Sequence, residues 1–243
     1  MIIREMTEYM ETLAPASLAE EWDNVGLLVG DPETELTRVV VTLDITEEAI
    51  AFAKEQGAEL ILSHHPLIFS PVKCLTAPSP LYRLASSGMA AFAAHTNLDA
   101  AAGGVNDALA NAIGLQNVSE AFGGIGRVGE LPDVMTPEAF AALVKDALGT
   151  PVQLRAGCKP IRTVALVSGG GGDFAAEAEA DAFLTGEMKH HEWIALPDTL
   201  TAVVAGHYAT ENVVVEPLCA RLRDAFPALT VVPFLGTAPY QTV

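Results

Sequence analysis

Apolar runs bounded by glycine, proline and polar clusters predict two successive series in which strands alternate with helices. The predicted strands span 38–44, 59–63, 90–95, 161–168, 181–185 and 201–205. The predicted helices span 46–58, 106–115, 174–180 and 213–226. Such alternation is typical of α/β folds with parallel strands.

The polar residues at the strand ends follow the same repeat. In the first half a strand ends at the His64–His65 pair, and a later strand is followed by His95 four residues before Asp99. In the second half comes a His190–His191 pair, and a later strand is followed by an H-x-x-x-E segment that begins at His207. This repetition favours two similar α/β lobes that arose by internal duplication and face each other across a metal-binding cleft. The expected boundaries are a first lobe at 1–118, a short connecting segment at 119–160 and a second lobe at 161–243.

Composition narrows the choice of partners. The chain of 243 residues is half hydrophobic, and its 13 Lys and Arg against 31 Asp and Glu give a formal charge of -18. A negative surface repels phosphate backbones, so we expect no nucleic-acid partner. The N-terminus lacks the layout of a secretory signal and the apolar runs are too short to span a bilayer. We therefore expect a cytoplasmic protein without membrane association.

The histidines and carboxylates at the strand ends predict a metal centre, because open α/β sheets bind ligands beyond the carboxyl ends of their strands. His64 and His65 are adjacent on an extended segment and so are suited to bind one ion each. If a helix begins after Gly206, His207 and Glu211 share one of its faces. Mixed imidazole and carboxylate ligands suit zinc, iron, manganese, cobalt or nickel. Two divalent ions about 3.5–4 Å apart require a bridging carboxylate, supplied by Glu211 or Asp99.

Other residues near these segments are candidates for catalysis. His95 is a candidate for a general acid or for a residue that supports the ligands, because its ordinary pKa is close to neutrality. Glu187 and His191 could orient substrate or move protons in the second lobe. From the residues alone, His95, His190 and His191 could also be ligands. The glycines that follow Ser168 could wrap N–H groups around a phosphate, although no P-loop lysine follows them.

Six blocks of the chain resemble the NIF-three-like family, whose bacterial members are commonly described as GTP cyclohydrolase 1 type 2. They are EEWDNVGLLVGD, ELILSHHPLIF, AAHTNLDAAAGGVNDALA, VSGGGGD, ADAFLTGEMKHHE and AGHYATEN. The resemblance implies the compact family form without an inserted domain, assembled as a toroidal homohexamer. It also implies a dinuclear centre with Glu211 as the bridge. The ligands implied by the family are His64, His65, Asp99, His207 and Glu211.

The expected function is therefore metal-dependent hydrolysis. Paired metals lower the pKa of a bound water and hold the resulting hydroxide against an electrophile. By the resemblance, the substrate is GTP or another nucleotide, opened at its ring with loss of formate. Two alternatives are a metal-dependent phosphoesterase acting on a nucleotide or a small phosphorylated substrate, and a non-catalytic metal-binding scaffold or regulatory protein. Release of formate or of inorganic phosphate separates the two enzymes.

Overall fold

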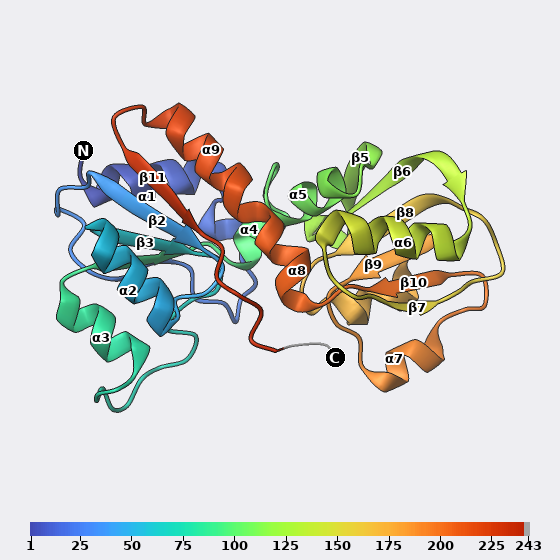
Figure 1. Ribbon diagram of the computed structural model, residues 1–243, viewed down its shortest axis with the longest axis horizontal. Helices are drawn as coiled ribbons and strands as arrows, with labels where there is room; N and C mark the ends of the chain where they lie inside the picture. Colours follow the sequence, from blue (N-terminus) through green and yellow to red (C-terminus); the bar gives the residue numbers. More distant parts are fainter. Residues whose placement is uncertain (241–243) are drawn as a thin grey trace. The chain divides into compact units, whose positions relative to one another are not determined.

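The computed structural model describes residues 1–240 and has a mixed α/β fold with two sheets. The chain divides into two compact units (Figure 1). The first unit comprises 1–102 and 215–237, and the second comprises 103–214 together with the segment that starts at Ala238. None of the helices formed by residues 1–240 combines the length and the apolar character needed to cross a membrane.

The first unit is built on a five-stranded sheet in the order β1-β4-β3-β2-β11. The chain enters it through α1 (Ile3–Leu13), η1 (Ala16–Leu18), β1 (Gly26–Val29), β2 (Arg38–Thr42), α2 (Glu47–Gln56), β3 (Leu60–Ser63), α3 (Pro80–Ser87), β4 (Ala90–Ala93) and α4 (Thr96–Ala100). It returns with α9 (Val215–Ala225) and β11 (Thr230–Phe234). Strands β2, β3, β4 and β11 are parallel, and β1 is an antiparallel edge.

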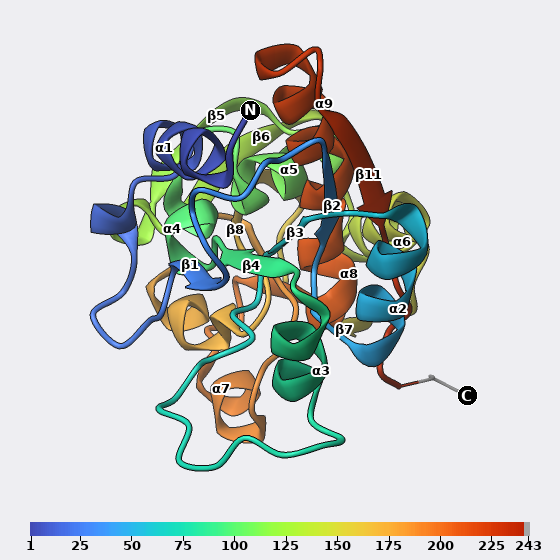
Figure 2. The ribbon, with the colours of Figure 1, turned by 90° about the vertical axis from the view of Figure 1, so that its left-hand side faces the viewer.

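Helix boundaries in the first unit follow local chemistry. Thr46 caps α2 by accepting the N–H of Ala49, and Gly57 ends the helix in the left-handed conformation. Ser79 caps α3 in the same way. Helices α2 and α3 lie side by side along one face of the sheet (Figure 2). Their apolar residues join Val40, Ile61 and other inward residues of the strands in one core.

The second unit carries a six-stranded sheet in the order β5-β6-β8-β9-β10-β7, of which β8, β9 and β10 are parallel. Its elements are α5 (Val105–Ala112), β5 (Gln116–Ala121), η2 (Phe122–Gly124), β6 (Gly126–Met135), α6 (Pro137–Leu148), β7 (Gln153–Arg155), β8 (Ile161–Val167), η3 (Gly171–Glu177), β9 (Ala182–Thr185), α7 (His190–Ala195), β10 (Thr201–Val204), α8 (His207–Glu211) and η4 (Asn212–Val214). Alternate residues of β8 face opposite sides. Val164 and Leu166 pack with α5 and α6, whereas Ala165 and Val167 pack with η3 and the segment around Leu196.

The structure agrees with the six predicted strands and corrects one predicted helix. Residues 174–180 do not form an α-helix, because the segment is the 3₁₀ helix η3, which ends at Glu177 before an extended Ala178. The glycines at its start have no side chain to cap an α-helix, and a tight turn is accommodated there instead. The sequence pattern predicted a helix between the second and third strands, where α3 lies, but gave no bounds for it. It missed the helices α1 and α6 and the strands β1, β5, β6, β7 and β11.

The compact units are divided differently from the predicted lobes. Segment 119–160 is not a plain connector, since it supplies most of β5, β6, α6 and β7 to the sheet of the second unit. Residues 215–237 return to the first unit. Residues 241–243 of the predicted second lobe lie outside the described residues. Duplication remains a prediction, supported by the matching parallel triplets β2-β3-β4 and β8-β9-β10.

Candidate metal centre

In the first unit, three histidines gather where strands β3 and β4 end. His64 and His65 follow β3, and His95 follows β4 directly before α4. A ring nitrogen of each lies within 4.8 Å of a ring nitrogen of the other two. The parallel pairing of β3 with β4 places these ends together at one edge of the sheet. Three imidazoles in this arrangement could hold a transition-metal ion.

Each of the three rings is oriented by an oxygen at Nδ1. Nδ1 of His64 lies 2.9 Å from the carbonyl oxygen of Ala94. Nδ1 of His65 lies 2.8 Å from Oδ1 of Asp44, and Nδ1 of His95 lies 2.9 Å from Oδ1 of Asp23. A carbonyl or an ionised carboxylate can only accept, so each Nδ1 carries the hydrogen and each Nε2 carries the lone pair. This is how metal-binding histidines are usually fixed.

Asp99 adds a carboxylate to the same end of the first unit. It lies in α4, is largely buried, and its Oδ1 is 3.7 Å from Nε2 of His64. The pKa of nearby His95 is lowered, mainly by burial and by the neighbouring His64 ring, and the hydrogen bond to Asp23 only partly opposes this. The predicted ligands His64, His65 and Asp99 are thus brought together with His95 beside them.

Two aromatic side chains border His95. Trp22 and Phe69 approach the ring with centroid distances of 6.1 and 6.3 Å, both nearly edge-on. The two rings pack on each other at 5.7 Å, yet they are 58% and 53% exposed. Asn24 joins their loops by donating to the carbonyl oxygen of Ile68 at 2.5 Å.

In the second unit, α8 carries the other predicted ligands. His207 and Glu211 are its first and last residues, and Nε2 of His207 is 3.0 Å from Oε2 of Glu211. Nδ1 of His207 is 3.3 Å from Oε1 of Glu187. The Glu211 side chain is only 5% exposed. The predicted shared helix face is therefore correct, and it presents a buried carboxylate beside an imidazole.

Glycines allow α8 to sit close to the neighbouring strand ends. A Cβ at Gly169 would overlap Oε1 of Glu211 and would lie 3.1 Å from Nε2 of His207, and this residue also has a φ of 57°. A Cβ at Gly186 would lie 2.8 Å from Cα of His207. Thr210 accepts the N–H of Gly169 at 3.0 Å and so ties α8 to the turn after β8. The glycine turn thus leaves space for the side chains of the proposed metal ligands His207 and Glu211.

Two N–H groups of the predicted phosphate cradle at this turn are already engaged by side chains. The N–H of Ser168 donates to Oδ1 of Asn106 at 2.8 Å, and that of Gly169 donates to Thr210. A backbone N–H that is committed to a side chain cannot also cradle a phosphate.

The remaining histidines of the second unit are exposed. His190 and His191 begin α7, and the His191 side chain is 78% exposed with Glu192 3.9 Å away. Of the candidate catalytic residues in this unit, Glu187 contacts His207, whereas His191 lies in neither of the clusters that could hold a metal.

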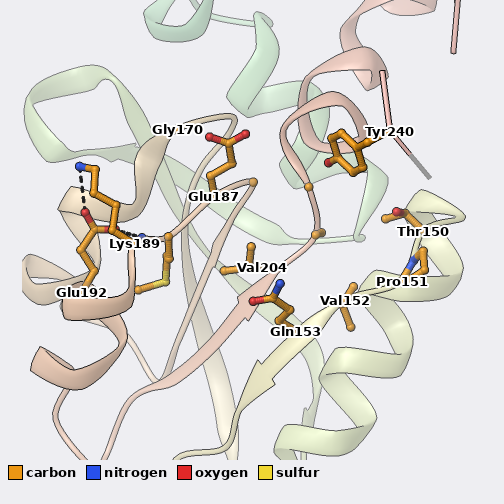
Figure 3. Close-up of a pocket in the computed structure, with 14 residues that line it drawn as sticks. Thr150, Pro151, Val152, Gln153, Gly170, Glu187, Lys189, Glu192, Val204 and Tyr240 are labelled. Carbon is orange, nitrogen blue, oxygen red and sulfur yellow. Dashed lines mark hydrogen bonds and ion pairs between the residues drawn. The ribbon is translucent and has the colours of Figure 1, made fainter. Parts of the chain in front are cut away.

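A cavity of about 530 Å³ lies in the second unit next to the elements that carry His207 (Figure 3). Gly170, Gly206 and Glu187 line it on that side, and Val204 and Gln153 line it from β10 and β7. Tyr240 and Thr150 complete its wall.

The charged side chains that line this cavity are mainly acidic. Its one lysine, Lys189, is 3.1 Å from both Glu192 and Asp173, and these partners raise the pKa of Lys189. Glu187 adds a further carboxylate. The lining therefore favours a ligand with hydrogen-bond donors over a free anion.

Sequence reasoning missed Asp23 and Asp44, which hold the His95 and His65 rings. The contacting residues are 72 and 21 positions apart in the chain, so no local sequence pattern indicates these contacts. Sequence reasoning also missed the reason for the glycine at position 169.

Comparison with known proteins gives a consistent result. A family model described as Duf34/NIF3 (NGG1p interacting factor 3) matches residues 1–237. A GTP cyclohydrolase 1 type 2 homolog of Clostridium perfringens is 38% identical over 207 residues, which cover 79% of each chain. A protein NIF3 homolog of Schizosaccharomyces pombe is 30% identical and covers 93% of this chain and 90% of its own.

Solved structures are similar over the whole chain. A hypothetical protein of Staphylococcus aureus aligns with a TM-score of 0.93 at 31% identity, covering 100% of this chain and 99% of its own.

Proposed function

Because the chain belongs to the Duf34/NIF3 family, we propose that it is a metal-dependent hydrolase that acts on a nucleotide-type substrate. The proposed ligands of its divalent ions are His64, His65, Asp99, His207 and Glu211. The observation that carries the proposal is the set of imidazoles whose Nδ1 atoms are already held by oxygens, which leaves Nε2 as the nitrogen suited to a cation.

The residues fit divalent ions of the transition series. The ligands combine neutral imidazole nitrogens with buried carboxylate oxygens, a donor set that suits zinc, iron, manganese, cobalt or nickel. Gly169 keeps clear the space beside Glu211 and His207 that any side chain would occupy. When bound, such ions lower the pKa of water and polarise an electrophile.

The chain's own residues supply orientation and substrate contacts. Asp44 and the Ala94 carbonyl fix the rings of His65 and His64. Glu187 contacts His207 and also lines the cavity, so it is suited to hold a substrate group beside that ligand. We propose that the cavity receives the uncharged, hydrogen-bond-donating part of the substrate, as a nucleobase edge would be.

Substrate class is supported by the names of relatives and by the cavity. Relatives from several bacteria bear the name GTP cyclohydrolase 1 type 2 homolog. Incubation of metal-loaded protein with GTP, followed by assays of formate and of phosphate, tests ring opening against phosphoester hydrolysis. A metal-loaded preparation that turns over no nucleotide would instead favour a metal-binding scaffold.

The proposal that each chain binds two metal ions can be tested directly. We expect two ions per chain by elemental analysis after loading with zinc or manganese. X-ray absorption should then detect a metal–metal distance of about 3.5–4 Å. His64→Ala and His65→Ala should each weaken a different site, and the exposed His190 provides the matched control as His190→Ala. Stoichiometry that stays at one or below in the wild type would contradict the dinuclear proposal.

A homohexameric ring is proposed from the family resemblance. Light scattering tests it, because a hexamer has six times the 25.5 kDa mass of the chain. A single species near the chain mass would remove any shared cavity from the proposal.

A further inference from the structure

We propose that Asp23 is a positioning residue that fixes the orientation and the tautomer of His95, so that Nε2 of His95 presents its lone pair to a substrate or a water molecule. The inference rests on the proposed hydrolytic function and adds to it a residue that orients a histidine of the site. It starts from a carboxylate whose side chain is 0% exposed and whose ring partner is 15% exposed.

Every contact of the Asp23 carboxylate comes from a hydrogen-bond donor. Its Oδ1 accepts the N–H of Asn24 at 2.8 Å and Nδ1–H of His95 at 2.9 Å. Its Oδ2 accepts the N–H of Thr96 at 3.0 Å and the hydroxyl of the same residue at 2.5 Å. Burial raises the pKa of Asp23, but the hydrogen bonds from Thr96 and His95 outweigh it and leave the pKa below its ordinary value. The carboxylate is therefore held in its ionised form.

Backbone N–H groups fix the direction of this network, because they can only donate. The N–H groups of Asn24 and Thr96 each point at one oxygen of Asp23. The N–H of Glu20 donates to Oγ1 of Thr96 at 3.0 Å, so the Thr96 hydroxyl hydrogen is left for Oδ2 of Asp23. Both carboxylate oxygens are thus committed as acceptors.

The hydrogen bonds of Asp23 determine the tautomer of His95. An ionised carboxylate has no hydrogen to give, so Nδ1 of His95 must be the donor and Nε2 must carry the lone pair. A ring nitrogen of His95 lies within 4.8 Å of one on His64 and of one on His65. Since Nδ1 is engaged by Asp23, Nε2 is the nitrogen that can accept a hydrogen bond at this place. Trp22 and Phe69 approach the same ring edge-on.

Asp23 acts through His95 and contacts no reacting atom in this proposal. With Nδ1–H held by Asp23, the lone pair on Nε2 of His95 can accept a hydrogen bond from an O–H or N–H group of the substrate or of a water molecule. The ring then orients that group, and no covalent bond forms or breaks in this role.

The first test measures the tautomer, which does not depend on turnover. Zinc-loaded protein labelled with ¹⁵N-histidine is studied by magic-angle-spinning NMR, and His95→Gln identifies the His95 signals by difference. We expect protonation at Nδ1 in the wild type. In Asp23→Ala the ring loses its acceptor and should shift toward the Nε2–H form that free histidine prefers. A wild-type His95 protonated at Nε2 would overturn the proposal even if the protein proves to be a hydrolase.

The second test measures turnover and metal content together. Asp23→Ala and the isosteric Asp23→Asn should lower kcat by about 10–100-fold, the usual effect of losing a group that orients a catalytic or metal-binding side chain. Both variants should keep the wild-type metal content, since neither removes a proposed ligand. Unchanged kcat in both variants would contradict the role of Asp23. If the wild type itself turns over nothing, the hydrolase proposal fails while the tautomer still tests the positioning.

A matched control separates this role from loop stability. Asn24→Ala removes the side-chain bond to the Ile68 carbonyl but keeps the backbone N–H that donates to Asp23. It perturbs the same loop, so we expect the wild-type tautomer and kcat. Equal losses in Asn24→Ala and Asp23→Ala would assign the effect to the loop and overturn the proposal.

Discussion

The candidate ligands of the two units are held in different ways. In the first unit each imidazole is oriented by an oxygen acceptor at Nδ1, two of which are carboxylates and one a backbone carbonyl. In the second unit His207 lies between two carboxylates, with Glu187 at Nδ1 and Glu211 at Nε2. The first arrangement presents nitrogen donors, whereas the second presents mainly negative charge.

The two H-x-x-x-[DE] segments also differ, although their spacing is the same. His95 precedes α4, and its Nδ1 is held by Asp23. His207 is the first residue of α8 and pairs directly with Glu211 one turn later. His95 thus lies one residue before its helix, whereas His207 is the first residue of its helix. This shift of one residue distinguishes the supporting histidine, His95, from the proposed ligand, His207.

The largest expected effect comes from Glu211→Ala. This change removes a buried carboxylate next to His207, and if Glu211 bridges two ions, their repulsion is no longer compensated. We expect loss of at least one bound ion per chain and of hydrolytic activity, measured by elemental analysis and turnover after circular dichroism confirms folding. His95→Ala is the counterpart and should keep both ions. The reverse pattern would mean that the first unit supplies the bridge.

Gly169→Ala should disturb the second unit alone. The new Cβ would overlap Oε1 of Glu211, and its backbone conformation costs an L-residue about 1–2 kcal/mol. We expect weaker metal binding by titration and a lower free energy of unfolding. Gly170→Ala is the control, because no atom lies within 4 Å of its Cβ and its φ is -81°. Equal effects of both changes would show that the space beside Glu211 is not what matters.

A smaller effect is expected at the opposite ends of the strands, where the two units use the same device. Glu59 precedes β3 and accepts the N–H groups of Thr37 and Arg38, while Asp181 precedes β9 and accepts those of Arg162 and Thr163. Partial burial raises the pKa of each carboxyl, but these bonds outweigh it, so both pKa values lie below the ordinary ones.

The pH dependence follows from that direction. Each depressed pKa adds stability that is present above the ordinary value of about 4 and is lost as the pH falls through the folded-state pKa. Glu59→Gln and Asp181→Asn should each cost about 1 kcal/mol near neutral pH, measured by urea unfolding. The difference from wild type should shrink below about pH 4. A cost at only one of the two sites would show that the units do not share this device.

The smallest expected effect belongs to His191→Ala. The side chain is 78% exposed, and exposed substitutions usually change the free energy of unfolding by no more than about 0.5 kcal/mol. Metal content should equal that of the wild type. A loss of metal would place His191 among the ligands and would make the second His-His pair functionally equivalent to the first.

The sequence was informative where chemistry and local pattern coincide. The parallel strands are short apolar runs, and the adjacent His64–His65 and the spacing from His207 to Glu211 are readable without a structure. The edge strand β1 was missed because it is only four residues long and half-buried throughout. The long β6 was missed because its last four residues are exposed or half-buried and it lacks a continuous apolar run. Asp23 could not be found because its role depends on a contact across 72 residues. The His190–His191 pair matches the His64–His65 pair in sequence, but His191 is exposed whereas His64 is buried, and burial is not encoded in the pair itself.

The pairing of β11 with β2 has a consequence for how the chain is made. Strand β11 is the last of the five strands of its sheet in chain order, and all 112 residues from 103 to 214 belong to the other unit. During synthesis at about 5–20 residues per second, residues 103–214 of the second unit leave the ribosome before β11 does. Until then the β2 edge of the first sheet exposes unpaired N–H and C=O groups, which favour association with other chains. Ribosomes that pause between α8 and β11 should therefore yield nascent chains that depend on chaperones, although all the proposed metal ligands have already been synthesised.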